Sequence, residues 1–341
     1  MARTRLGPVT AAVAALVLSG SAAARAQGVV VKLATLVPDG SAWHGILKEM
    51  AAEWKTASGG AVTLRIYAGG VAGDDADVVR KIRLGTLSAG LLSSAGLAEV
   101  DRSVYAMQIP MAYADYAEYD AVLAKIGPTI AQALDAKGFV LLDWADGGWV
   151  KFFTRSPVTS PEDLKKLKLF AWAGDTEAVE IWKAAGFNPV PLPSTEISTA
   201  LQTGLINALP TTPQAALLLG WFNQAKNMTD VNWAVLLGAT VVAKTTWEKI
   251  PEAVRPALLA SARKAGGRLR EETRRRASLD LEAMGTRGLN VIHLDAAAIE
   301  LWRKAAESAY PRVRGGEVPA AAFDQAMAAR DEYRREAPAK K

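Results

Sequence analysis

The chain has 341 residues, half of them apolar, with 40 lysines and arginines against 35 aspartates and glutamates and no cysteine. A chain of this size can bury one large core or two medium ones, and two lobes are the better expectation. The small charge excess gives no indication of nucleic-acid binding. The lack of cysteine excludes disulfides, thiol catalysis, cysteine metal sites and a lipid-modified cysteine anchor.

Residues 1–26 have the three parts of a secretory signal peptide. Arg3 and Arg5 form a basic start, "VTAAVAALVL" is a short apolar core, and "ARA" ends at Ala26 as a small-x-small cleavage site. A membrane anchor is the weaker alternative, because the apolar run is much shorter than the roughly 20 residues that span a bilayer. Cleavage after Ala26 would leave a nearly neutral protein, and we expect it in the periplasm.

Strand and helix patterns alternate along the first part of the remaining chain. "VVVKLATLV" predicts a strand, "SAWHGILKEMAAEWKTASGG" a helix that ends at Gly59 and Gly60, "AVTLRIYAGG" a strand, "DDADVVRKIRLGT" a short helix and "SAGLLSSAG" a buried strand. This alternation predicts a parallel sheet with helices on both faces.

The same pattern returns from "KGFVLLDWADGG" onward, with "KLKLFAWAG" as a strand, "DTEAVEIWKAAG" as a helix, and a later strand, "NWAVLLGATVVAK", before a long helix that ends at Gly288. Two such units predict an α/β fold with two lobes, a hinge and a central cleft. We assign 27–148 plus about 236–285 to the first lobe, and 149–235 plus about 286–335 to the second.

Residues for catalysis or metal binding are scarce. His44 and His293 are the only histidines and fall in different predicted lobes, so neither a serine triad nor a histidine metal cluster is expected. Asp74, Asp75 and Asp77 are grouped as in some cation sites, but they directly precede a helical pattern, which favours helix capping. We therefore expect no catalytic residue, no metal and no cofactor.

Tryptophan is the residue type in surplus, with ten in the chain. Three of them, Trp54, Trp182 and Trp302, have helical spacing and are assigned to the core. Others lie near predicted strand ends, where α/β proteins bind ligands and where flat aromatic surfaces suit a ligand cleft. These tryptophans are Trp43, Trp144, Trp149, Trp172, Trp221 and Trp233.

Five stretches in order resemble a known family: "LATLVPDGSAWHGILKEMAAEW", "GDDADVVRKIRLGTLSAG", "SPEDLKKLKL", "AAGFNPVPLPSTEISTALQTGLINA" and "KTTWEKIPEAVRPAL". They resemble the periplasmic solute-binding subunits of tripartite ATP-independent periplasmic (TRAP) transporters, of the dicarboxylate-binding-protein type. The resemblance implies a periplasmic binding protein fold with two lobes around a hinge. It also implies a non-enzymatic receptor that captures a small organic solute and delivers it to membrane transporter subunits.

The sequence departs from the family where a substrate carboxylate would bind. The family commonly has an arginine shortly after "DLKGLK", and alignment on "DLKKLKLFAW" puts Phe170 at that position. The family's "ENP" corresponds to Thr211, Thr212 and Pro213. Lys151 corresponds to a basic residue often seen after the preceding strand, and it is equally able to reach a ligand or to point to solvent.

These departures predict a neutral or largely apolar solute, because a carboxylate buried beside Phe170 and Trp172 would lose hydration without gaining a partner. Asp175 and Glu177 at the next helix start would also disfavour an anion. A polar head of the solute would be reached by Lys151, Thr212 or His44, although His44 is equally well explained as a surface or capping residue. The predicted ligand-binding residues are Phe170, Trp172, Trp149, Lys151, Trp43, His44, Thr212, Trp144 and Trp233.

Three other interpretations remain open. The same fold would also serve a periplasmic carrier for an export or lipid-trafficking system. A conventional organic-acid receptor that uses Lys151 is a second alternative. A periplasmic hydrolase is the weakest, because no nucleophile, base and orienting residue come together. The segment after Pro319 is short and charged, which favours a monomer over a dimer formed through the last helix.

Overall fold

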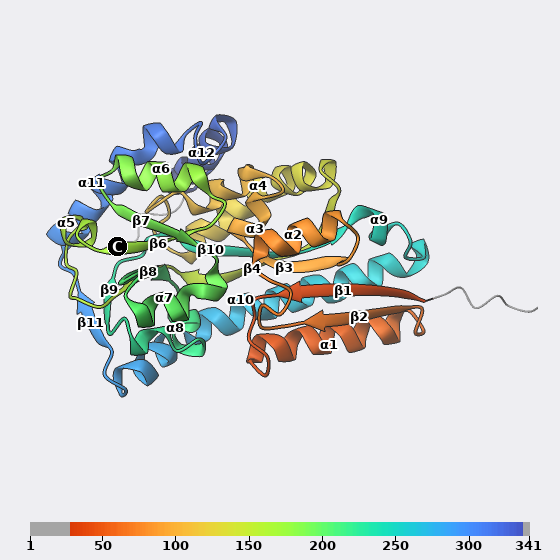
Figure 1. The fold of residues 1–341 in the computed structure, drawn as a ribbon. Coiled ribbons are helices and arrows are strands. Elements are labelled where there is room, and N and C mark those ends of the chain that lie inside the picture. Colours follow the sequence, from red (N-terminus) through yellow and green to blue (C-terminus); the bar gives the residue numbers. More distant parts are fainter. Residues whose placement is uncertain (1–27, 337–341) are drawn as a thin grey trace, which may run out of the picture.

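The computed structural model describes residues 28–336, which form two α/β lobes joined by a long helix (Figure 1). The predicted α/β class and the two-lobe architecture are confirmed. The signal peptide predicted for residues 1–26 lies outside the described residues.

The first lobe is built on a five-stranded sheet in the order β2-β1-β3-β10-β4. β1 pairs in parallel with β2 and β3, whereas β10 runs antiparallel to β3 and β4. The prediction of a parallel sheet is therefore wrong for this lobe, because β10 returns from the other lobe in the opposite direction. The strands are β1 (Val29–Thr35), β2 (Val62–Tyr67), β3 (Ala89–Ser93), β4 (Phe139–Trp149) and β10 (Val235–Ala243).

The helices of the first lobe begin and end largely at the residues that the sequence indicated. Helix α1 starts after Ser41, whose side chain accepts from the His44 amide, and Gly59 and Gly60 follow its end with positive φ. Asp74 caps α2, as expected, by accepting from the Asp75 amide. The helices are α1 (Ala42–Ala57), α2 (Asp75–Arg83), α3 (Ser94–Ala98), the 3-10 helix η1 (Arg102–Gln108), α4 (Tyr116–Ala136) and α9 (Lys244–Trp247).

The second lobe is built on a six-stranded sheet in the order β11-β9-β5-β8-β6-β7. Its strands are β5 (Lys151–Thr154), β6 (Lys168–Trp172), β7 (Asn188–Leu192), β8 (Ala208–Thr211), β9 (Asn227–Asp230) and β11 (Asn290–His293). Its helices include α5 (Pro161–Lys165), α6 (Thr176–Ala184), α7 (Ile197–Thr203) and α8 (Pro213–Leu218). β8 pairs in parallel with β6 and antiparallel with β5, so this sheet is mixed as well.

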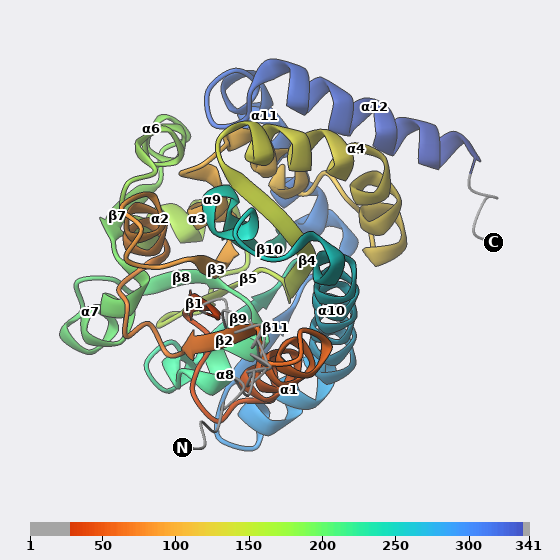
Figure 2. The ribbon, with the colours of Figure 1, turned by 90° about the vertical axis from the view of Figure 1, so that its right-hand side faces the viewer.

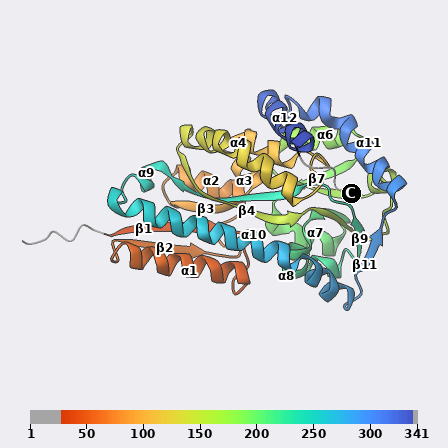
Figure 3. The same cartoon turned by 180° about the vertical axis from the view of Figure 1, so that it is seen from behind.

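Three helices complete the chain. Figure 3 shows α10 (Arg255–Gly285) running across both lobes, in contact with α1 and β4 of the first and α8 of the second. α11 (Ala296–Val313) packs against α5 and α6. α12 (Ala320–Glu336) packs against α4 and η1, beside α4 in Figure 2. The predicted division placed about 286–335 in the second lobe, whereas α12 covers the first.

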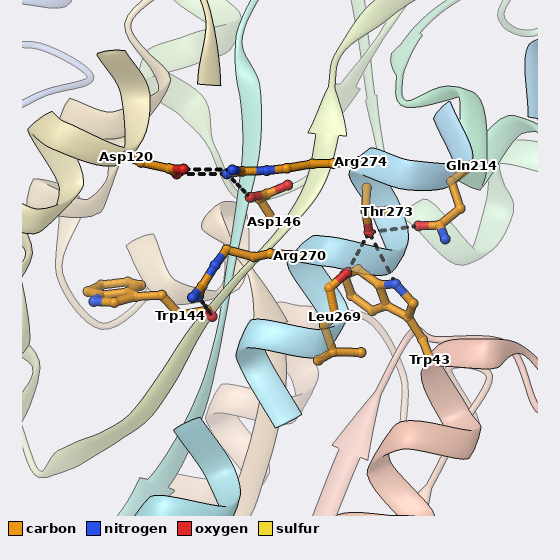
Figure 4. A network of polar contacts seen from close by, with 9 residues as sticks. All are labelled: Trp43, Asp120, Trp144, Asp146, Gln214, Leu269, Arg270, Thr273 and Arg274. Atoms are coloured by element: carbon orange, nitrogen blue, oxygen red, sulfur yellow. Dashed lines mark hydrogen bonds and ion pairs between the residues drawn. The ribbon is translucent and has the colours of Figure 1, made fainter. Parts of the chain in front are cut away.

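Helix α10 approaches β4 closely at Gly266. A Cβ atom there would lie 2.7 Å from the Trp144 carbonyl oxygen, so only glycine fits without a shift of the backbone. About two turns farther along α10, Arg274 donates to Asp120 of α4 and to Asp146 of β4 (Figure 4). Asp146 is buried, and this shared arginine supplies its charge partner.

Two sets of polar contacts join the lobes directly. Asp74 of the first lobe accepts from the backbone amide of Ser194 at 3.0 Å and from its hydroxyl at 2.7 Å. Asp175, at the start of α6 in the second lobe, accepts from the Tyr105 hydroxyl at 2.6 Å and from the Arg102 guanidinium at 3.2 Å. The lobes are therefore held together by their own residues.

The close contact of α10 predicts opposite effects for two neighbouring glycines. Gly266→Ala should destabilise the protein by about 1–3 kcal/mol, because its Cβ atom would meet backbone atoms that cannot move aside. Gly267→Ala is the control: it has no atom within 4 Å of the new Cβ, and it should stabilise the helix by about 0.5–1 kcal/mol. Denaturant unfolding measures both, and equal effects would contradict the packing.

The contact between Arg102 and Asp175 predicts that Arg102→Gln lets the lobes separate more often. Loss of this partly exposed ion pair should weaken closure by up to about 1 kcal/mol, seen as a larger radius of gyration in small-angle scattering. Arg80→Gln removes an ion pair within α2 and should leave the scattering unchanged. Identical scattering from Arg102→Gln and the parent protein would show that this contact does not hold the lobes.

Candidate ligand-binding cleft

A cavity of about 340 Å³ lies between the two lobes and is called the central cavity below. The last residues of four strands line it: Thr35, Ser93, Trp172 and Thr211. These residues belong to β1, β3, β6 and β8, two strands from each lobe. The arrangement follows the rule that ligands of open α/β sheets bind beyond the carboxyl ends of strands.

The lining of the central cavity is mainly apolar. The first lobe contributes the loop after β1 and part of β10, and the second contributes β6, β8 and α8. The apolar side chains are Leu36, Val37, Pro38, Trp43, Leu91, Leu92, Phe170, Trp172, Ile197, Leu209, Pro210, Ala215, Leu218, Leu219, Trp221, Leu236 and Leu237. The polar ones are mostly hydroxyl groups of serine and threonine, together with Gln214.

Charge in the central cavity is confined to one acidic residue. No lysine, arginine or histidine is among its lining residues, all of which lie in the described part of the chain, and Asp75 is the only ionisable one. Asp75 is 2 % exposed, and Ser93 donates to its Oδ2 from both the amide and the hydroxyl. Burial raises the pKa of Asp75 to about 7, although the bonds from Ser93 act in the opposite direction.

Several of the aromatic residues on which the sequence prediction was based line this cavity. Phe170 is 2 % exposed, and its ring lies edge-on to that of Trp172 with 5.5 Å between centroids. Trp221 also lines the cavity, with its indole nitrogen 3.0 Å from the Ser198 hydroxyl. Of the nine predicted binding residues, the structure brings together Phe170, Trp172, Trp43 and Thr212 at the central cavity.

Trp43 is fixed by a residue far away in the sequence. Its indole nitrogen donates to the Thr273 hydroxyl of α10 at 3.2 Å. That hydroxyl is also within reach of the Leu269 carbonyl at 3.0 Å and of Gln214 Oε1 at 3.4 Å. In Figure 4, Trp43 and Gln214 approach Thr273 from two sides. Thr273 thus connects α10 with one lining residue from each lobe.

Lys151 does not line the central cavity. Its ammonium group donates to Asp230 at 2.6 Å and to Asn232 at 2.7 Å, and His293 also contacts Asp230. The partners of Lys151 are therefore the last residue of β9 and a residue of the segment that follows it.

Three more predicted residues lie elsewhere. Trp144 lies on the α4 side of β4, where its ring packs close to Gly127. Trp149 packs against Tyr116 with 5.5 Å between ring centroids. His44 contacts Asp39 at 2.7 Å and does not line the central cavity, which agrees with the capping alternative.

Trp233 lines a second cavity of about 170 Å³, which shares Phe170 and Trp172 with the central cavity as lining residues. Trp182 and Trp302, assigned to the core from their spacing, line this cavity as well. Trp302 is fully buried, so its core assignment also holds.

Several lining residues were not predicted from the sequence. Ser93 is the last residue of β3, and Asp75, Ser194 and Gln214 lie at helix starts with no motif of their own. Only the rule that ligands bind at strand ends could have indicated Ser93.

The described residues contain no group of three metal-binding side chains, and no helix among them could cross a membrane.

Comparison with protein families gives one match over most of the chain. The model of the bacterial extracellular solute-binding protein family 7 matches residues 33–315. A solute-binding protein of Roseobacter denitrificans is 26% identical over 297 residues, covering 85% of this chain and 89% of that protein. The C4-dicarboxylate-binding periplasmic protein DctP of Rhodobacter capsulatus is 27% identical over 304 residues, covering 86% and 88%.

Solved structures of TRAP periplasmic solute-binding proteins have the same fold. The protein of Pseudomonas putida F1 with bound D-glucuronate has a TM-score of 0.80 at 25% identity, covering 89% of this chain and 96% of that one. The protein of Ralstonia eutropha H16 with bound (S)-2-acetolactate has a TM-score of 0.82 at 22% identity, covering 89% and 99%. The chain belongs to family 7 of the bacterial extracellular solute-binding proteins, the DctP-type receptors of TRAP transport systems, which bind solutes and are not enzymes.

Proposed function

We propose that this TRAP receptor captures a neutral or largely apolar organic solute in the periplasm and delivers it to a membrane permease. The observation that carries the proposal is the lining of the central cavity, to which the described part of the chain contributes many apolar side chains, one acidic residue and no basic residue. Membership of the family supports the periplasmic location and the membrane partner.

The energetics of burial support an uncharged solute. Moving a carboxylate from water into an apolar site without a partner costs several kcal/mol. Phe170 stands where the resemblance places an arginine, and no guanidinium or ammonium group of residues 28–336 lines the cavity. Lys151 is already paired with Asp230, so its use by a ligand would require breaking that pair.

An organic-acid receptor is the second candidate. Relatives of known structure hold acids, D-glucuronate and (S)-2-acetolactate among them. In this chain an acid would depend on hydroxyl and amide donors, such as those of Thr211, Thr212 and Gln214. Such neutral donors stabilise a carboxylate less than a bidentate arginine does.

We also propose that the receptor acts as a monomer. The apolar face of α12 is used inside the subunit, where Phe323, Ala326 and Ala329 are buried in the core of the first lobe. These apolar residues of α12 are therefore not available for contact with a second copy. Light scattering coupled to size exclusion should give the mass of one chain.

Binding measurements on three proteins test the nature of the solute. The parent protein should bind succinate and D-glucuronate at least about tenfold more weakly than Phe170→Arg, because the new guanidinium would supply the missing carboxylate partner. Lys151→Ala is the matched control, which removes a cation outside the cavity and should not change solute binding. Isothermal titration calorimetry measures the affinities, and thermal unfolding shows whether Phe170→Arg is folded.

Binding measurements on the parent protein test the proposal even if Phe170→Arg does not fold. Micromolar binding of succinate or D-glucuronate by the parent protein would overturn the proposal. Loss of that binding in Lys151→Ala would establish the organic-acid alternative in its place. Native mass spectrometry of protein purified without refolding should instead show a co-purified uncharged organic molecule.

A further inference from the structure

We propose that the bound solute extends past Phe170 and Trp172 into the second cavity, so that the natural ligand is an elongated apolar molecule. This inference rests on the proposed function and specifies the shape and chemistry of its solute. It gives the second cavity the role of a subsite for the tail of the ligand.

The two cavities adjoin along a shared boundary. The second cavity has about half the volume of the central one, 170 Å³ against 340 Å³. Both are lined by the same five residues at their boundary: Phe170, Trp172, Pro210, Thr211 and Leu236. A solute seated against these residues in the central cavity therefore contacts the boundary of the second cavity.

The boundary between the cavities is held by packing. The Phe170 and Trp172 rings contact each other edge to face, and the Trp172 indole nitrogen makes no hydrogen bond within the described residues. A change of rotamer at Trp172 would therefore break no hydrogen bond. Trp172 is also only half-buried, and we expect its ring to shift when a ligand crosses the boundary.

Aromatic rings make the second cavity a favourable place for an apolar tail. Trp233 lies between Trp182 at 5.5 Å and Trp302 at 6.2 Å, measured between ring centroids. Phe187 adds a further ring. Alanines of α6 and α11 complete the lining and leave room that larger side chains would fill. Such flat apolar surfaces contribute binding energy with little loss of side-chain freedom.

The charges at the edge of the second cavity disfavour an anionic tail. Its ionisable lining residues, within the described part of the chain, are Tyr105, Asp175 and Glu317. Asp175 is paired with Arg102 and accepts from the Tyr105 hydroxyl, and burial raises the pKa of Glu317 to about 7. A carboxylate at this end of the ligand would gain no unpaired cation from these residues, so an apolar and uncharged tail fits the second cavity better.

A series of straight-chain primary alcohols, from 1-butanol to 1-decanol, tests the second cavity. In the parent protein the affinity for the alcohol should rise by about fourfold per methylene, as the alkyl chain extends from the central cavity into the second cavity. Ala178→Leu places a larger side chain in the second cavity only, and should stop this rise at the longer alcohols. Ala215→Leu, which fills the central cavity only, should weaken all members of the series.

The outcomes separate this inference from the proposed function. If the affinity rises with alcohol length equally in Ala178→Leu and in the parent protein, the second cavity is not a subsite. The proposal that the receptor binds a neutral or largely apolar solute then still stands. If hexanoate and octanoate bind the parent protein more tightly than the alcohols of equal length, or if no alcohol binds, both are overturned. Ala305→Leu on α11 fills the same cavity and replaces Ala178→Leu if that variant does not fold.

Discussion

The close packing of α10 against β4 is the contact on which the arrangement of the site depends. Because Gly266 has no side chain, the helix lies near enough to β4 for Arg270 to donate to the Trp144 carbonyl and for Arg274 to pair with Asp146. The same placement brings Thr273 to Trp43 and Gln214. A helix displaced outward would lose the link between the lining residues of the two lobes.

The sequence predicted the fold better than the site. Alternating strand and helix patterns identified most elements, since period and turn residues are local properties. The prediction of a parallel sheet was wrong where β10 joins it, because strand direction is set by contacts distant in the sequence. Lys151 shows the same limitation. Its partner Asp230 is a residue of β9, and no local sequence pattern indicates that the two residues pair.

Aromatic residues show which part of a site can be read from sequence. Phe170 and Trp172 were predicted to bind the solute from their place near the end of a strand, and the structure puts both at the central cavity, on a strand whose neighbours are parallel. Trp144 lies on a strand too, but consecutive side chains of a strand point to opposite faces, and its face meets α4. The second cavity depends on α11, which only the folded structure brings beside Trp233.

The direct bonds between the lobes affect how a solute is released. In a receptor that closes on its ligand, ligand binding normally supplies the free energy of closure. The apparent affinity then equals the intrinsic affinity multiplied by the fraction of the free protein that is closed. Here Asp74 with Ser194, and Asp175 with Arg102, contribute to closure from the protein side. Closure of the lobes therefore depends less on charge contacts with the solute, and opening of the lobes must break these contacts between residues of the two lobes.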